Sequence, residues 1–108
     1  MPANVLRFTL AMSSASDILT AIQQYHIRFV RFIWCDNANV IRAKAVCTTF
    51  IQDYLDGDGV GIAAAQQALP VMYDALSPGS GLTPAGEAHM RADWRTFATL
   101  PYAAGHAR

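Results

Sequence analysis

The chain has 108 residues, a length typical of one domain. Hydrophobic residues make up 53% of it and charged residues only 15%, and its 8 basic side chains balance its 8 acidic ones. This neutral balance argues against nucleic acid and anionic membranes as partners, because both select basic surfaces. The chain also lacks an apolar run of transmembrane length and the features of a signal peptide, so we expect a cytoplasmic protein.

The first element expected is a helix. Residues 1–16 carry no clear apolar period and are assigned to an N-terminal arm, followed by one domain at 17–108. Ser14, placed three residues before Asp17, is typical of a capped helix start. A helix over 15–25 is predicted by the spacing of its apolar residues, which are Ile18, Leu19, Ile22 and Tyr25.

A β-hairpin is predicted next. The run at 27–35 is rich in β-branched and aromatic residues, which favours a strand that is central or covered on both faces. Turn-forming residues follow at 36–39, and the segment 40–47 then alternates in polarity. In this second strand Arg42 and Lys44 share one face, and the opposite face carries Ile41, Ala43 and Ala45.

The middle of the chain combines short elements with a long connection. A short helix is expected to start at Thr49, to pack beside the hairpin and to stop at Gly57. A short strand is expected around 62–65. The proline- and glycine-rich stretch 66–86 predicts a long irregular connection, with at most a helical turn at 71–76.

Two last strands are expected at 87–92 and 97–100, with a turn at 93–96 between them. The order of elements is then helix, hairpin, helix, strand, loop, strand, strand. Such an order predicts an α+β domain with mixed or antiparallel strand pairing.

The two cysteines, Cys35 and Cys47, lie at the ends of the two hairpin strands. They lack the CxxC or Cys/His spacing of a metal or redox site. Two buried thiols are the interpretation favoured for a cytoplasmic protein, and a disulfide between them is the alternative.

No complete catalytic, cofactor-binding or metal-binding set is found in the sequence. The histidines lack ligand spacing, and the serines lie in capping or turn sequences.

Three features are candidates for an interface instead. Arg42 and Lys44 would present two cations together, with a solvated sheet face as the alternative. Asp93, followed by Trp94 and Thr96, is typical of an Asx-type turn beside a large ring, with a purely structural turn as the alternative. The third feature is the long connection, for which a plain surface linker is the alternative.

Three segments, in chain order, resemble the N-terminal β-grasp domain of the glutamine synthetase family. The first is RFVRFIWCDNANVIRAKAV, a strand-turn-strand in which the family places an aspartate before the turn and a basic residue after it. The second is FIQDYLDGDGVGI. The third is GEAHMRADWRTFATLPYA, which resembles the family's P-D-x-x-T…L-P stretch, with Ala92 replacing the usual proline and matches at Asp93, Thr96, Leu100 and Pro101. The resemblance covers residues 17–107.

The resemblance implies a β-grasp-like mixed sheet with one or two packed helices. Members of the family use ATP to join ammonia or an amine to the side-chain carboxylate of glutamate, at a site that holds Mg²⁺ or Mn²⁺. That site lies between the N-terminal domain of one subunit and the catalytic C-terminal domain of its neighbour, in a ring-shaped homo-oligomer. The nucleotide and metal ligands belong to the catalytic domain, which is absent from this chain, so the chain alone is expected to be inactive.

One departure from the family concerns the amine. Ammonia-using members have an F-D-G-S-S-like segment whose aspartate helps to bind ammonium, whereas the corresponding stretch 61–65 reads Gly-Ile-Ala-Ala-Ala. Loss of this charge suggests a parent enzyme similar to the γ-glutamyl-amine ligases, which take larger amines. The candidate interface or substrate-wall residues are therefore Arg42, Lys44, Ala63, Ala64, Asp93, Trp94 and Thr96.

Two other functions stay open. A stand-alone β-grasp module would bind a protein through an exposed strand edge and would have no ligase role. A small-molecule pocket under the long connection is the weaker alternative, because no convergent polar set is visible there.

Overall fold

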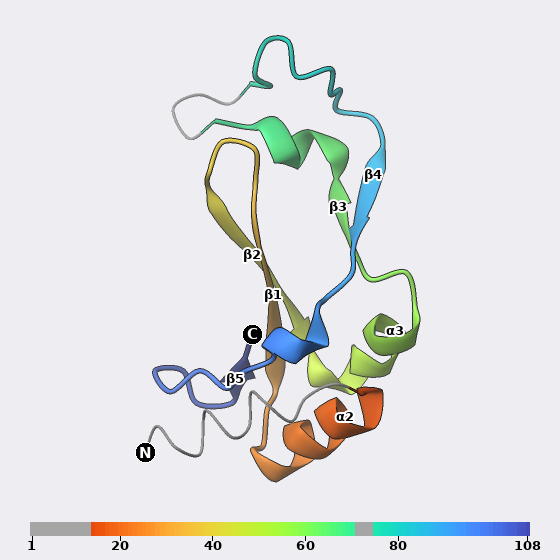
Figure 1. Cartoon of the computed structure of the whole chain (residues 1–108), viewed down its shortest axis with the longest axis vertical. Helices are drawn as coiled ribbons and strands as arrows, with labels where there is room; N and C mark the ends of the chain where they lie inside the picture. The colour runs from red at the N-terminus through yellow and green to blue at the C-terminus, as the bar shows by residue number, and fades with distance from the viewer. Residues whose placement is uncertain (1–13, 71–74) are drawn as a thin grey trace.

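The computed structural model describes residues 14–70 and 75–108 (Figure 1). Its helices and strands are, in chain order, α2 (Ala15–Gln24), β1 (Phe29–Cys35), β2 (Ile41–Cys47), α3 (Ile51–Asp56), β3 (Val60–Ala63), β4 (Glu87–Met90) and β5 (His106–Ala107). Short 3₁₀ helices connect some of them, namely η1 (Thr48–Phe50), η2 (Ala64–Ala68) and η3 (Trp94–Thr96). The predicted α+β class is confirmed.

The strands form a mixed three-stranded sheet and a separate two-stranded hairpin, which Figure 1 shows side by side. In the sheet, β1 is antiparallel to β2 along its whole length and parallel to β5 at Phe29 and Val30. In the second hairpin, β3 and β4 are antiparallel, with Ala63 opposite Glu87. The strand at 27–35 is therefore central, as predicted.

Helix α2 begins where the sequence predicts. The Ser14 hydroxyl accepts a hydrogen bond from the Asp17 amide at 3.2 Å, which satisfies one of the free N–H groups of the first turn. The helix ends at Gln24, and its inward face buries Ile18, Ala21 and Ile22.

The predicted boundary between arm and domain, at residues 16 and 17, falls inside helix α2. Because α2 starts at Ala15, residues 15 and 16 belong to the helix and not to the arm. The rest of the predicted arm, residues 1–13, lies outside the described residues.

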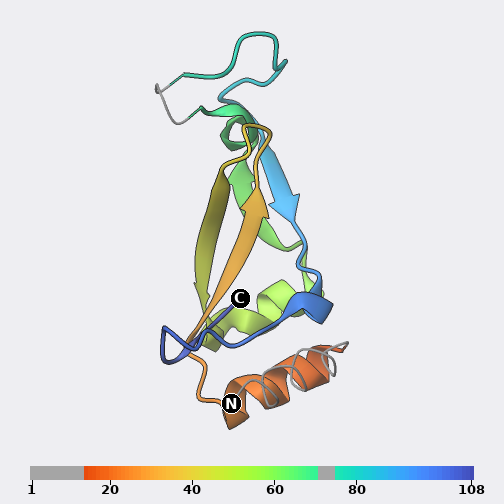
Figure 2. The same ribbon diagram turned by 60° about the vertical axis from the view of Figure 1, so that its left-hand side comes forward.

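One apolar core joins the two helices to the sheet. Phe97 and Ile18 are its largest fully buried side chains. The other buried members are Ala21, Ile22, Ile27, Val30, Phe32, Val46, Ile51, Val60 and Ala107. Figures 1 and 2 both place α2 and α3 at one end of the elongated molecule and the segment that precedes β4 at the other, with the tip of the β1–β2 hairpin below that segment. The core therefore lies at the helical end, and the two hairpins extend from it.

The two faces of the β1–β2 hairpin differ in what covers them. The core face buries Val30, Phe32 and Val46. The opposite face is open to solvent, and its exposed residues are Ile33, Ile41, Ala43 and Ala45. The second strand alternates as predicted, but the face with Arg42 and Lys44 is the one that turns toward β3 and η2. The central strand is therefore covered on one face only, since Ile33 is 46% exposed.

The predicted strand at 97–100 is wrong. Among the described residues, its strand-type pairing is limited to one isolated bridge between Thr99 and Ala107. The strand that pairs with β1 is instead β5, which directly follows Gly105 in the chain. The Gly105 carbonyl accepts hydrogen bonds from the amides of Arg28 and Phe29. A strand of two residues is too short to show alternation, so the sequence pattern could not reveal it.

Other element bounds also shift. Strand β3 starts at Val60 and ends at Ala63, because residues 64–68 form a 3₁₀ helix. Part of the helical turn predicted at 71–76, residues 71–74, lies outside the described residues. Of the other described residues of the predicted connection 66–86, residues 75–86 contain no helix or strand, as predicted, whereas residues 66–68 belong to η2, which the sequence did not predict.

Neither cysteine is buried, contrary to the prediction. Cys35 is exposed at the end of β1, and Cys47 is half-buried at the end of β2. The antiparallel register places Cys47 opposite Phe29 and Cys35 opposite Ile41, so the thiols lie at opposite ends of the hairpin. This separation excludes a disulfide between them within one chain.

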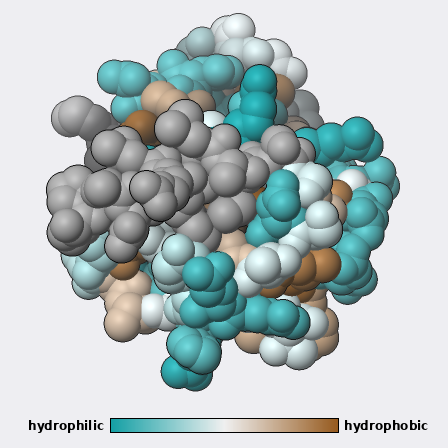
Figure 3. Space-filling view, turned by 60° about the horizontal axis from the view of Figure 1, so that its bottom comes forward, coloured by the Kyte–Doolittle hydropathy of each residue, from teal (hydrophilic) through white to brown (hydrophobic). Residues whose placement is uncertain are grey.

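Figure 3 views the helical end of the molecule, where hydrophilic residues surround smaller hydrophobic areas. No helix in the described part of the chain is long and apolar enough to cross a lipid bilayer.

Candidate functional site

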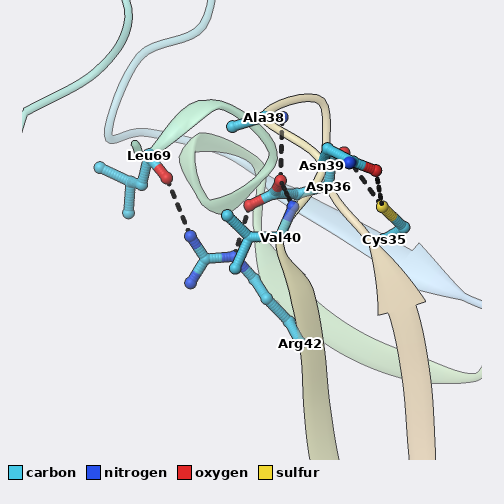
Figure 4. A network of polar contacts seen from close by, with 7 residues as sticks. All are labelled: Cys35, Asp36, Ala38, Asn39, Val40, Arg42 and Leu69. Carbon is cyan, nitrogen blue, oxygen red and sulfur yellow. Dashed lines mark hydrogen bonds and ion pairs between the residues drawn. The ribbon is translucent and has the colours of Figure 1, made fainter. Parts of the chain in front are cut away.

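The turn between β1 and β2 is organised around one carboxylate (Figure 4). Asp36, which is 7% exposed, accepts hydrogen bonds from the amides of Ala38 and Val40 at 2.9 Å each. Its other oxygen accepts from Arg42 Nε at 2.6 Å. The same guanidinium donates from Nη2 to the Leu69 carbonyl at 2.9 Å. The ion pair therefore closes the hairpin turn and fastens it to the segment after η2.

These contacts determine the charge of the pair. The hydrogen bond from Arg42, followed by that from Val40, lowers the pKa of Asp36 below its usual value. The carboxylate is therefore charged at neutral pH, and it neutralises the guanidinium inside the molecule. Arg42, predicted as an interface cation, is thus held in an internal contact.

Lys44 joins the two hairpins. Its Nζ donates a hydrogen bond to the Gly61 carbonyl of β3 at 2.7 Å. An ammonium group has three donors, so this contact leaves others available. Because the Lys44 side chain is exposed, its charge can still act on a molecule that approaches β2 and β3.

A cleft of about 470 Å³, called here the hairpin cleft, opens beside this contact. The predicted residues Lys44 and Ala63 both line it. The other lining residues are Trp34, Ala43, Gly61, Ile62, Gln66 and Glu87. An ammonium, a carboxylate, an amide and an indole thus surround small apolar side chains, a combination that can hold a small polar molecule.

The three alanines at 63–65 lie where β3 passes into η2. Ala63 is exposed and lines the hairpin cleft, Ala64 is half-buried, and Ala65 is buried. The Ala64 amide donates to the Gly86 carbonyl at 3.2 Å, which holds this junction against the residue before β4. Of the two predicted alanines, Ala63 therefore faces the cleft and Ala64 lies just outside its lining.

Asp93 caps η3 and forms the Asx-type turn that the sequence predicts. Its carboxylate accepts the Arg95 amide at 3.2 Å and the Arg95 guanidinium at 2.9 and 2.8 Å. The Thr96 hydroxyl donates to the Asp93 carbonyl at 2.7 Å. The hydrogen bonds from Arg95 lower the pKa of Asp93, and the same pairing raises the pKa of Arg95. Asp93 and Thr96 are therefore both engaged within the turn.

Trp94 packs into the protein beside this turn. Its ring meets Phe32 edge-on at 5.7 Å between centroids and lies 6.4 Å from Phe97. Because Phe32 and Phe97 belong to the core, Trp94 extends the core toward the turn.

A second groove, of about 530 Å³, lies between β1 and the segment that follows β4. It contains Asp93, Trp94 and Thr96, and it does not contain Lys44 or Ala63. Its cationic lining residues are Arg31, Arg91 and Arg108. Five of the seven predicted residues are thus divided between two cavities that share Trp34, whereas Arg42 and Ala64 line neither, so the predicted set does not form one site.

Sequence reasoning missed Trp34, Gln66 and Glu87. Glu87 could have been found by pairing the predicted strands 62–65 and 87–92, because antiparallel pairing brings it opposite Ala63. Trp34 gave no signal beyond its position in a strand. Its indole Nε1 is buried and has no hydrogen-bond partner among the residues that the structure describes.

Within 14–70 and 75–108, no group of three or more His, Cys, Asp or Glu residues could hold a metal ion. No protein-family model, curated protein or solved structure matches the chain.

Proposed function

We propose that the chain is the N-terminal domain of a glutamine synthetase-type ligase, an ATP-dependent enzyme that joins glutamate to ammonia or an amine. The domain contributes one wall of an active site shared between the subunits of a homo-oligomer. A catalytic C-terminal domain supplies the residues that bind ATP and Mg²⁺ or Mn²⁺.

One observation carries this function. The three segments that resemble the family, 28–46, 50–62 and 86–103, all contribute to the hairpin cleft. Lys44 comes from the first segment, Gly61 from the second and Glu87 from the third. The β3–β4 pairing and the Lys44–Gly61 hydrogen bond bring them together. A wall of a shared site requires such a convergent, accessible surface.

The Asp36–Arg42 ion pair gives additional support. The family pattern has an aspartate before the hairpin turn and a basic residue after it, and here these two residues bind each other at 2.6 Å. The pattern therefore has a physical role in this chain, which is to fix the turn at the distal end of the sheet.

The test is to follow the reading frame of the source gene beyond the codon for Arg108. We expect it to continue into a catalytic domain, and the whole protein should release ADP from ATP only when glutamate and ammonia or an amine are both present. The catalytic domain expressed without residues 1–108 serves as the control and should be inactive. A stop codon after Arg108, or ADP release that is independent of glutamate, would contradict the proposed function.

A stand-alone interaction module is the second candidate, favoured by the edge of β1. Strand β5 covers this edge at Phe29 and Val30 only, so residues 31–35 have no strand partner there among the described residues. The second groove runs along the same edge. An extended peptide could add to such an edge through main-chain hydrogen bonds. A reading frame that ends at Arg108 would favour this candidate.

A further inference from the structure

Glu87 places a carboxylate in the hairpin cleft. It is the first residue of β4 and pairs with Ala63 of β3. Its Oε1 lies against Gly61, in the space that a side chain at residue 61 would fill. The absence of a side chain at Gly61 therefore gives the carboxylate its position.

The charges nearby leave this carboxylate available. Within the described ranges, its charged-group contact is with the imidazole of His89, at 3.6 Å between Nε2 and Oε2, and both side chains are about half exposed. Such an exposed pair contributes little free energy. Lys44 lines the same cleft but donates to the Gly61 carbonyl. An incoming ammonium group can therefore bind Glu87 without breaking a buried contact.

The other residues that line the hairpin cleft favour contact with the hydrocarbon part of a ligand. Trp34, Ile62 and Ala63 contribute an aromatic ring and small apolar groups. An aromatic ring attracts a cation and also packs against alkyl groups. The volume of about 470 Å³ is far larger than the roughly 30 Å³ occupied by one water-sized ion. The hairpin cleft is therefore matched to a cation that carries a hydrocarbon body.

We propose that the hairpin cleft binds a primary monoamine in its alkylammonium form, with the ammonium group on Glu87 and the hydrocarbon body against Trp34 and Ala63. This site rests on the proposed function, in which an amine is a substrate, and it specifies the class of amine. Glu87 supplies from β4 the negative charge that residues 61–65 lack. The charge of Lys44, which the neutral Gly61 carbonyl does not cancel, repels every cation in the cleft, and it disfavours diamines and polyamines most because they carry more positive charge.

The experiment is an NMR titration of the ¹⁵N-labelled chain with n-butylammonium chloride at constant ionic strength. The Gly61 and Ala63 amides and the Trp34 indole N–H should shift and saturate. Glu87→Gln should weaken the apparent affinity about two- to fivefold, the effect of losing one solvent-exposed charge pair. Asp53→Asn, which removes an exposed carboxylate from α3, should leave the affinity unchanged.

Comparison probes identify what is recognised. Ammonium chloride, spermidine and uncharged n-butanol should each bind more weakly than n-butylammonium. Equal affinity in the Glu87→Gln variant, no saturable shift in the wild-type chain, or tighter binding of spermidine would overturn the amine site. The titration needs no catalytic domain, so its failure leaves the ADP-release test of the proposed function unaffected, and a negative ADP-release assay leaves a measured amine affinity in place.

Discussion

The Asp36 carboxylate holds the β1–β2 turn through Ala38, Val40 and Arg42, and this role makes stability depend on pH. Its pKa is lowered in the folded chain relative to the unfolded value of about 3.9. Its contribution is therefore present above about pH 4 and is lost as the pH falls toward the lower, folded-state pKa. We expect Asp36→Asn to lower the free energy of unfolding at neutral pH.

Urea unfolding followed from about pH 7 down to about pH 3 measures this effect. The difference between wild type and Asp36→Asn should shrink on acidification, because the protonated aspartic acid and asparagine are both neutral. Asp53→Asn, at an exposed position, is the matched control and should show a much smaller difference. If the difference in unfolding free energy between wild type and Asp36→Asn stays constant or grows on acidification, the charge on Asp36 does not stabilise the turn.

At the scale of single residues, the sequence showed which side chains carry charge, but not which groups those side chains contact. Arg42 and Lys44 were identified as a pair of cations, but Arg42 is neutralised by Asp36 and Lys44 is bound to Gly61. The second contact links residues 17 positions apart on different hairpins. Local spacing carries no information on a contact of this range, so the bound state of Lys44 could not be predicted.

At the scale of elements, the β3–β4 hairpin depends on Gly59. This residue has φ of +86°, and a Cβ added to it would collide with the Met90 backbone. Gly79 has a similar φ of +78° with open space around it. In Gly79→Ala we expect a cost of about 1–3 kcal/mol from the backbone conformation alone. Gly59→Ala should cost more, because the strands must also separate.

Urea unfolding of the two glycine variants at neutral pH gives the comparison. The difference between the two losses of unfolding free energy measures the cost of the steric clash between residue 59 and the Met90 backbone, since the penalty for positive φ is common to both variants. Equal losses of stability in the two variants would mean that Met90 moves away without cost.

Elements with several periodic residues were predicted well, and very short ones were not. Helix α2 and the β1–β2 hairpin follow from their capping, apolar spacing and turn residues. Strand β5 does not, because its two residues are defined by pairing with β1 and not by a pattern of their own. Glu87 was not predicted as a cleft residue, because its position opposite Ala63 depends on the pairing of β3 with β4.

At the scale of the whole molecule, one core connects every element near the helical end, and Phe97 is its largest fully buried side chain. Phe97→Ala should lower the free energy of unfolding by about 3–5 kcal/mol, through lost burial and the cavity left behind. Denaturant unfolding followed by Trp fluorescence and by circular dichroism should show one shared transition. Tyr102→Ala, at a position 78% exposed, should change stability by less than about 0.5 kcal/mol. Similar losses in both variants would contradict a core centred on Phe97.

The pairing of β5 with β1 has a consequence for the order of events during synthesis. Strand β1 and its partner β2 are neighbours in sequence, whereas the Arg31–His106 contact spans 75 positions. On the ribosome, the first hairpin can therefore form early, but Phe29 and Val30 of β1 stay without their β5 partner until residues 105–107 have emerged. Contacts of such long range are slow to form. Until then, the main-chain groups of Phe29 and Val30 on this edge are available to chaperones or to neighbouring nascent chains.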